Sequence, residues 1–297
     1  MTSATPDANG IPGAFWLGGG SGSGKTTVAL AVARQLDLRL YPVDGYTYTH
    51  ARRAESGAYP LAKAVNAQTP AQRQEGAPAE LARRFAATSA ERLTMILDDV
   101  RALGDGPTVL IEGPQLFPEL VAPLLGSPDH GLWLLPSPDF ARRSIARRYA
   151  QVPEALERRY ERDVLLTELN RRQAATLRLP VLEVDGTRPV DVSIARVSDR
   201  IARLPGLRRA ASGPERHRIR MAENAAAVVQ LVAWWQDAIG PERMPDGPVF
   251  PFACECETLG CERAAEASVT EYQRRSAAGP VTTHRVAESR WAGPAVQ

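Results

Sequence analysis

Lysine, cysteine and long apolar segments are scarce in this chain of 297 residues. Of its 36 basic residues only Lys25 and Lys63 are lysines, and the remainder are arginines. An arginine excess of this size, beside many alanines and prolines, reflects the base composition of the genome. A lysine that is present against this background therefore needs a specific chemical reason.

The only three cysteines, Cys254, Cys256 and Cys261, lie within eight residues of one another. An odd and tightly clustered set argues against a disulfide framework and indicates a reducing compartment. Metal binding is the leading use predicted for such a cluster.

No run of 18 consecutive apolar residues is present, which argues against a membrane span. Residues 1–13 lack the basic start and apolar run of a secretory signal, so we expect a cytoplasmic protein. Hydrophobic residues make up 44%, charged residues 24%, and the net charge is +2, which is typical of an ordinary soluble globular protein. This charge balance makes nucleic-acid binding the weakest of the interpretations considered below.

Short apolar runs bounded by Gly or Pro predict five strands, at residues 14–17, 38–43, 108–112, 131–135 and 180–185. Helical spacing predicts helices between and after them, at residues 26–36, 78–103, 118–125, 138–149, 154–177 and 189–204. Strands that alternate with helices and are apolar throughout predict an α/β fold around a five-stranded parallel sheet. Residues 46–76 are expected to be irregular, because prolines and glycines interrupt any period.

The length suggests about two domains. We expect a disordered leader at residues 1–13, the α/β domain at 14–204, a basic linker at 205–213 and a C-terminal module at 214–297. In this module a long helix capped by Ser212 is predicted to run from residue 214 to a Gly-Pro stop at 240–241, before the cysteines. A shorter helix is predicted at residues 269–275.

A glycine-rich segment between the first predicted strand and helix satisfies the P-loop pattern G-x-x-x-x-G-K-[ST]. It reads Gly19-Gly20-Ser21-Gly22-Ser23-Gly24-Lys25-Thr26. Glycines let successive backbone N–H groups wrap phosphates, and the helix N-terminus adds a favourable dipole. Lys25 is expected at the β- and γ-phosphates of ATP and Thr26 on Mg²⁺, with Thr27 the less favoured magnesium ligand. The alternative is a flexible Gly/Ser turn with an incidental lysine.

About 20 residues after this motif, Asp44 ends the second predicted strand beside a cluster of hydroxyl side chains. At this point the chain resembles the nucleoside-monophosphate-kinase-like group of small P-loop kinases, which includes shikimate, gluconate and chloramphenicol kinases. The resemblance covers residues 14–204. It implies that Asp44 binds the acceptor hydroxyl or acts as general base, and that Gly113 and its neighbours line the acceptor pocket. The alternative for Asp44 is a turn cap before Gly45.

Glu112 ends the third predicted strand, the usual position for an acid near the P-loop magnesium. A metal-bound water or the substrate is its expected partner, and an ordinary solvated strand end is the alternative. In the kinases that the chain resembles, a mobile lid carries arginines that neutralise the transferring phosphoryl group, and Arg147 and Arg162 are the candidates here. Arg188, in the Asp-Gly-Thr-Arg-Pro segment after the fifth strand, matches the adenine-side loop of the same group.

The cysteines form a C-x-C-x₄-C pattern, and His284 is the only histidine downstream. Three thiolates and one imidazole predict a closed, structural tetrahedral zinc site at Cys254, Cys256, Cys261 and His284. Glu255 or water remains an alternative fourth ligand, and ordinary reduced cysteines an alternative to metal binding. This segment also resembles a module of actinobacterial proteins with an R-x-x-EN helix, here at residues 220–224, before a C-E-C cluster.

The leading hypothesis is an ATP- and Mg²⁺-dependent phosphotransferase that acts on a small hydroxyl-bearing metabolite or natural product, with Zn²⁺ as a structural ion. The runner-up is a regulatory P-loop ATPase whose zinc-bearing C-terminal module binds a protein partner. A third interpretation is nucleic-acid binding through the basic linker and the cysteine segment.

Overall fold

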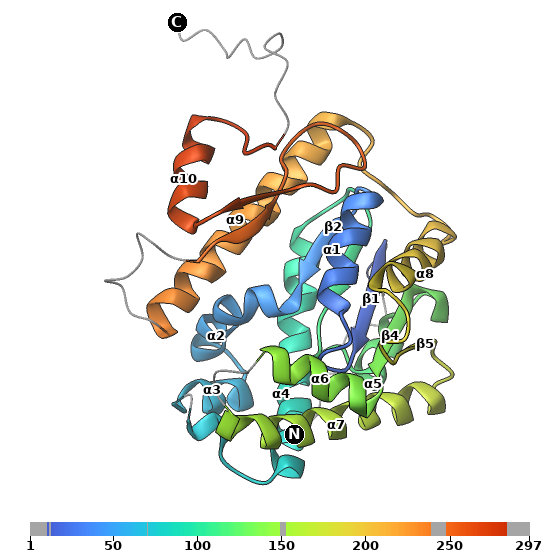
Figure 1. Ribbon diagram of the computed structural model, residues 1–297, viewed down its shortest axis with the longest axis vertical. Coiled ribbons are helices and arrows are strands. Elements are labelled where there is room, and N and C mark those ends of the chain that lie inside the picture. Colours follow the sequence, from blue (N-terminus) through green and yellow to red (C-terminus); the bar gives the residue numbers. More distant parts are fainter. Residues whose placement is uncertain (1–10, 12, 70, 149–152, 239–247, 284–297) are drawn as a thin grey trace, which may run out of the picture. The chain divides into compact units, whose positions relative to one another are not determined.

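The computed structural model describes residues 11, 13–69, 71–148, 153–238 and 248–283 (Figure 1). The chain divides into two compact units, Met1–Arg209 and Ala210–Gln297. This division falls within residues 205–213, the expected linker. The backbone of Arg208 still belongs to the first unit, because its carbonyl accepts a hydrogen bond from the N–H of Thr108, 2.8 Å away.

A five-stranded parallel sheet organises the first unit, as the sequence predicts. Its strands are β1 (Ala14–Gly19), β2 (Arg39–Pro42), β3 (Val109–Glu112), β4 (Gly131–Pro136) and β5 (Val181–Val184), in the order β2-β3-β1-β4-β5. Every residue of β1, β3 and β4 is buried. Strands covered on both faces need no polar alternation, which explains the continuous apolar runs in the sequence.

Helices cover both faces of the sheet. They are α1 (Lys25–Gln35), α2 (Thr47–Ser56), α3 (Pro60–Asn66), α4 (Pro78–Ala102), α5 (Pro118–Val121), α6 (Pro138–Arg148), α7 (Pro153–Thr176) and α8 (Val190–Ala202). The helices α1 and α8 share one apolar cluster, and α4 and α7 share the other. No helix within the described ranges has both the length and the hydropathy to cross a membrane.

The expectation that residues 46–76 are irregular is wrong, because they form α2 and α3. The buried face of α2 consists of His50 and Ala54, one turn apart, and α3 buries no residue completely. An apolar period is therefore almost absent from the sequence here. Polar contacts from α2 to α4, described below, replace the apolar face that the pattern analysis required.

In the second unit α9 (Gly213–Ala238) and α10 (Val269–Ala278) accompany an antiparallel pair, β6 (Phe250–Ala253) and β7 (Ala264–Ala267). Phe252 and Tyr272 stack at 4.1 Å between ring centroids in its small core. The hairpin was not predicted, because each strand has four residues and β7 carries three alanines. The cysteine segment forms the connection between these two strands.

Candidate functional site

The glycine-rich loop, residues 19–24, connects β1 to α1 at the carboxyl end of the sheet. Gly24 precedes α1 with a φ of +81°, in the left-handed region that glycine favours. A Cβ on Gly20 would lie 2.3 Å from Thr167 Oγ1 and 2.7 Å from Pro136 Cδ. Helix α7 and the end of β4 therefore press so closely on the loop that only glycine fits at this position.

Two buried polar side chains, Ser23 of the loop and Lys25 of the first turn of α1, lie at this junction. Lys25 is 6% exposed, and its ammonium donates to the carbonyl oxygen of Gly20 at 2.7 Å. This bond folds the lysine back over the loop. Ser23 is also buried, and its Oγ has no hydrogen-bond partner among the described atoms. A buried hydroxyl without a partner is costly, so this is a place where a bound group would supply the missing bond.

The hydroxyl of Thr26 faces the carboxylate of Glu112. Its Oγ1 lies 3.3 Å from each carboxylate oxygen. Glu112 ends β3, next to β1 in the sheet, and is only 3% exposed, so the alternative of a solvated strand end is wrong. Thr26 itself is exposed. One hydroxyl and one carboxylate in contact form a set of oxygen ligands that suits Mg²⁺.

Asp44 follows β2, which lies on the opposite side of β3 from β1, and belongs to the short helix Val43–Tyr46. It is exposed, and its Oδ1 accepts a hydrogen bond from Gln115 Nε2 at 2.9 Å. Thr47 Oγ1 donates to the Asp44 carbonyl at 2.8 Å. Arg92 of α4 donates to Thr47 Oγ1 at 2.6 Å, and its guanidinium attracts the Asp44 carboxylate. Asp44 is thus an oriented carboxylate beside a cation.

A polar network behind Asp44 holds Arg92 in place. Arg92 Nε donates to His50 Nδ1 at 3.3 Å, so the ring proton lies on Nε2, 2.9 Å from Asp99 Oδ2. The hydroxyl of Tyr41 donates to the same oxygen at 2.6 Å, and Arg53 pairs with Oδ1. Burial lowers the pKa of His50. Burial alone would raise the pKa of Asp99, but the hydrogen bonds and the Arg53 charge hold it below its ordinary value.

Two further residues predicted for this site lie on α6 and α7, helices that border the loop: a Cβ on Gly22 would lie 3.1 Å from Ser144 Cβ of α6. Arg162 on α7 pairs with the buried Asp163 at 2.5 Å and lies 5.9 Å from the ring centroid of Phe85. Arg147 is exposed on α6, and its Nε donates to the Arg143 carbonyl at 3.4 Å. Thr27 is exposed on α1. The structure therefore brings together the loop residues and Glu112, with Asp44 one strand further along.

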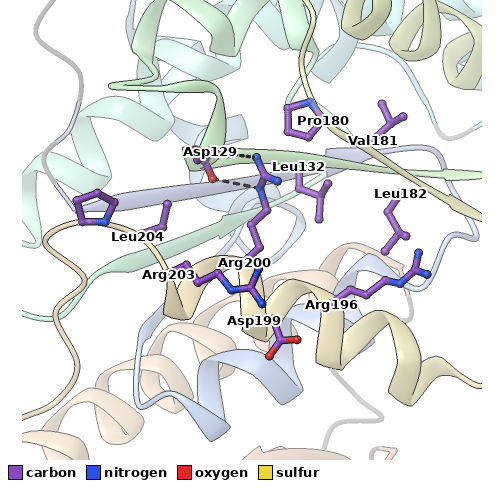
Figure 2. Close-up of a pocket in the computed structure, with 11 residues that line it drawn as sticks. Asp129, Leu132, Pro180, Val181, Leu182, Arg196, Asp199, Arg200, Arg203 and Leu204 are labelled. Atoms are coloured by element: carbon purple, nitrogen blue, oxygen red, sulfur yellow. Dashed lines mark hydrogen bonds and ion pairs between the residues drawn. The ribbon is translucent and has the colours of Figure 1, made fainter.

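Arg188 lines a cavity of about 330 Å³ with Asp185 and Gly186, after β5. A neighbouring cavity of about 490 Å³ lies between β5 and α8 (Figure 2). Figure 2 shows Arg200 reaching across it to Asp129, with the Arg200 Nη2–Asp129 Oδ1 distance at 2.8 Å. This second cavity lies near the amino ends of β4 and β5. The glycine-rich loop is at the opposite end of the strands.

The three cysteines of the second unit converge. Their sulfur atoms all lie within 4.8 Å of one another. Cys254 and Cys261 are buried and Cys256 is half-buried. Burial alone would raise the pKa of Cys254, but hydrogen bonds from Thr283 N and Oγ1 hold it below its ordinary value. Burial raises the pKa of Cys256 to about 11.

Glu255, the alternative fourth ligand, turns away from the sulfurs. Its Oε1 accepts from Asn224 Nδ2 at 2.9 Å and from Tyr272 OH at 2.5 Å, and its Oε2 accepts from Val281 N at 2.7 Å. Both oxygens are therefore engaged with α9, α10 and the segment after α10. His284 lies outside the described residues, directly after Thr283 in sequence.

The comparisons with known proteins give no family for this chain. No family model matches it, and no curated protein is similar to it at a significant level. Assignment of a function therefore depends on the site itself.

Sequence reasoning missed several residues of these sites. Gln115 donates to Asp44, Arg92 donates to Thr47 nearby, and Thr167 packs against Gly20. In the second unit, Arg216 of α9 donates to carbonyls of the cysteine segment. Gln115 follows the predicted acid at the end of β3 by three residues, which is a usable signal. Arg92 and Arg216 were hidden because arginine is so common in this chain.

Proposed function

We propose that the first unit is an ATP- and Mg²⁺-dependent phosphotransferase that acts on a small hydroxyl-bearing molecule. The observation that supports this most is the contact of Thr26 with the buried Glu112, directly after a lysine-bearing glycine loop. Asp44 lies after the next strand, β2, at the same carboxyl end of the sheet. Phosphate-binding, magnesium-binding and acceptor-binding groups would then lie in a row.

The loop residues suit the phosphates of a nucleoside triphosphate. Gly19 to Gly24 supply backbone N–H groups at the start of α1, where the helix dipole favours anions. Ser23 Oγ lacks a partner that a phosphate oxygen would provide. Lys25 would exchange its bond to the Gly20 carbonyl for the β- and γ-phosphates, and Thr26 would bind Mg²⁺ with Glu112 behind it. Bound Mg²⁺ supplies the charge that offsets the phosphate oxygens.

Asp44 would receive the acceptor. Gln115 fixes the direction of its carboxylate, and the Arg92 guanidinium attracts that carboxylate from α4. In the reaction the hydroxyl oxygen forms a bond to the γ-phosphorus, the bond from phosphorus to the ADP oxygen breaks, and the hydroxyl proton passes to Asp44. Arg162 and Arg147 would neutralise charge on the transferring group, and Arg188 would flank the base.

For the second unit we propose a structural Zn²⁺ bound by Cys254, Cys256 and Cys261, with His284 as the fourth ligand. In a tetrahedral zinc site the sulfurs stand about 3.8 Å apart, given Zn–S bonds of about 2.3 Å. The observed limit of 4.8 Å needs little adjustment. The engaged oxygens of Glu255 favour the imidazole over the carboxylate.

An acceptor screen tests the enzymatic proposal. Purified protein is incubated with γ-labelled ATP, Mg²⁺ and a panel of sugars, polyols, hydroxy acids, nucleosides and hydroxylated natural products. We expect label transfer to at least one class, and loss of that transfer in Lys25→Ala. Lys63→Ala is the matched control, because Lys63 is the only other lysine and lies on α3.

Two results would contradict parts of this proposal. Slow ATP hydrolysis that no acceptor accelerates would favour the regulatory ATPase, with the second unit as a partner-binding module. Retention of ATP binding in Lys25→Ala would contradict the assignment of the loop itself.

A further inference from the structure

Arg216 of α9 lies against the cysteine segment from the inside of the second unit. Its side chain is completely buried, with 0% exposure. Nη1 donates to the Cys254 carbonyl at 3.1 Å and also to the carbonyl of Cys256, and Nη2 donates to the Cys261 carbonyl at 2.8 Å. One guanidinium therefore binds the backbone of all three cysteines.

Arg216 also contacts a sulfur directly. Its Nη1 lies 3.6 Å from Cys256 Sγ, within the range of an N–H···S hydrogen bond. Thr283 donates to Cys254 Sγ from its N–H at 3.4 Å. Cys254 and Cys256 therefore each accept a hydrogen bond at sulfur.

The charges of the site fit this arrangement. Three thiolates on a divalent ion leave a net charge of −1, which is costly to bury without a counter-charge. The guanidinium of Arg216 carries a charge of +1. With a neutral fourth ligand, the ion, the three thiolates and this guanidinium sum to zero. The carboxylate of Glu255 is also buried, and it is held separately by Asn224, Tyr272 and the N–H of Val281.

We infer that Arg216 is a positioning residue of the metal site: it fixes the carbonyls of Cys254, Cys256 and Cys261 and offsets the thiolate charge, so that the site takes a divalent ion with a neutral fourth ligand. This inference rests on the proposed metal site and is independent of the proposed phosphotransferase. Arginine suits this role because its planar fork reaches several acceptors at once, which an ammonium does not do.

The test uses the full chain in four forms: wild type, Arg216→Gln, Arg216→Lys and Arg218→Gln. Arg218 is exposed on the same helix and donates to the Pro214 carbonyl, so its replacement is the matched control. Each metal-free protein is titrated with Co²⁺, whose thiolate charge-transfer absorption reports the number of sulfur ligands. Zn²⁺ affinity is then measured by competition with a chromophoric chelator, and helix content by circular dichroism.

We expect wild type and Arg218→Gln to bind one Co²⁺ per chain with three-thiolate absorption. Arg216→Gln should bind Zn²⁺ about 10- to 100-fold more weakly, in the range of outer-shell substitutions, with the charge-transfer band displaced. Arg216→Lys should recover the band position, because the charge is kept, and only part of the affinity, because the fork is lost. If Arg216→Gln does not fold, the comparison of Arg216→Lys with Arg218→Gln carries the test.

Two results would overturn the inference, and they differ. A wild-type protein that binds no metal refutes the metal site and the role of Arg216 together. A wild-type protein that binds metal, beside a folded Arg216→Gln or Arg216→Lys with unchanged affinity and absorption, refutes the role of Arg216 alone. An acceptor screen without transfer affects neither result.

Discussion

The network at Asp99 gives the sharpest test of how the first unit is held together. Asp99 accepts hydrogen bonds from Tyr41, His50 and Arg53, and its side chain is 23% exposed. Asp99→Asn keeps the size of the side chain but turns an NH₂ group toward donors that require an acceptor. We expect it to lower the free energy of unfolding of this unit.

The size of this loss follows from the contacts. Hydrogen bonds to a charged group contribute about 1.5–3 kcal/mol each, and asparagine retains one accepting oxygen. Counting one to two lost bonds, with partial exposure taken into account, gives about 3 kcal/mol. For a unit of this size that corresponds to a fall in the melting temperature of about 6–12 °C.

Asp98→Asn is the matched control. Asp98 is the preceding residue of α4, its side chain is 49% exposed, and it faces Arg53 at 3.3 Å and Arg101 at 3.9 Å. Exposed pairs of this kind contribute about 0.2–1 kcal/mol at most. Both variants are compared with wild type by thermal and urea unfolding. Equal losses for Asp98→Asn and Asp99→Asn would refute the reasoning, because they would show that burial and convergence at Asp99 add nothing.

Three further predictions concern His50, Gly20 and Glu255. Because the pKa of His50 is lowered in the folded protein, the unfolded chain takes up a proton at a higher pH than the folded chain does, so the free energy of unfolding should fall as pH drops below about 6.5. His50→Asn should flatten this part of the pH profile. An unchanged profile would contradict a buried, neutral His50 ring. Gly20→Ala should lower the free energy of unfolding by about 1–3 kcal/mol through overpacking, and a second substitution, Thr167→Ala, should restore part of that loss. If the effects of the two substitutions simply add, the contact between these positions is contradicted. Glu255→Gln should lower the free energy of unfolding of the second unit by about 2–3 kcal/mol in urea unfolding, since it sets an NH₂ group among three donors. The control is Glu266→Gln at an exposed position, which should change that free energy by less than about 0.5 kcal/mol.

Several parts of the fold were predictable because they follow local periods. The five strands are short apolar runs between Gly or Pro, and burial on both faces makes such runs visible without alignment. Helix α6 begins as expected after Ser137, whose Oγ accepts the N–H of Phe140 at 3.3 Å. Helix α2 was missed for the opposite reason. His50 packs through hydrogen bonds, which leave no apolar period to detect.

The glycine-rich motif determined by itself which residues form the loop before α1, because its glycines lie between an apolar run and a helical pattern. The cysteine spacing likewise determined which three sulfurs meet. The tertiary structure alone decided what surrounds them. Gln115 and Arg92 reach Asp44, and Arg216 reaches the cysteine carbonyls, across 38 or more positions of sequence. A chain rich in arginine cannot mark these contacts in advance, since only folding selects which guanidinium is buried beside which acceptor.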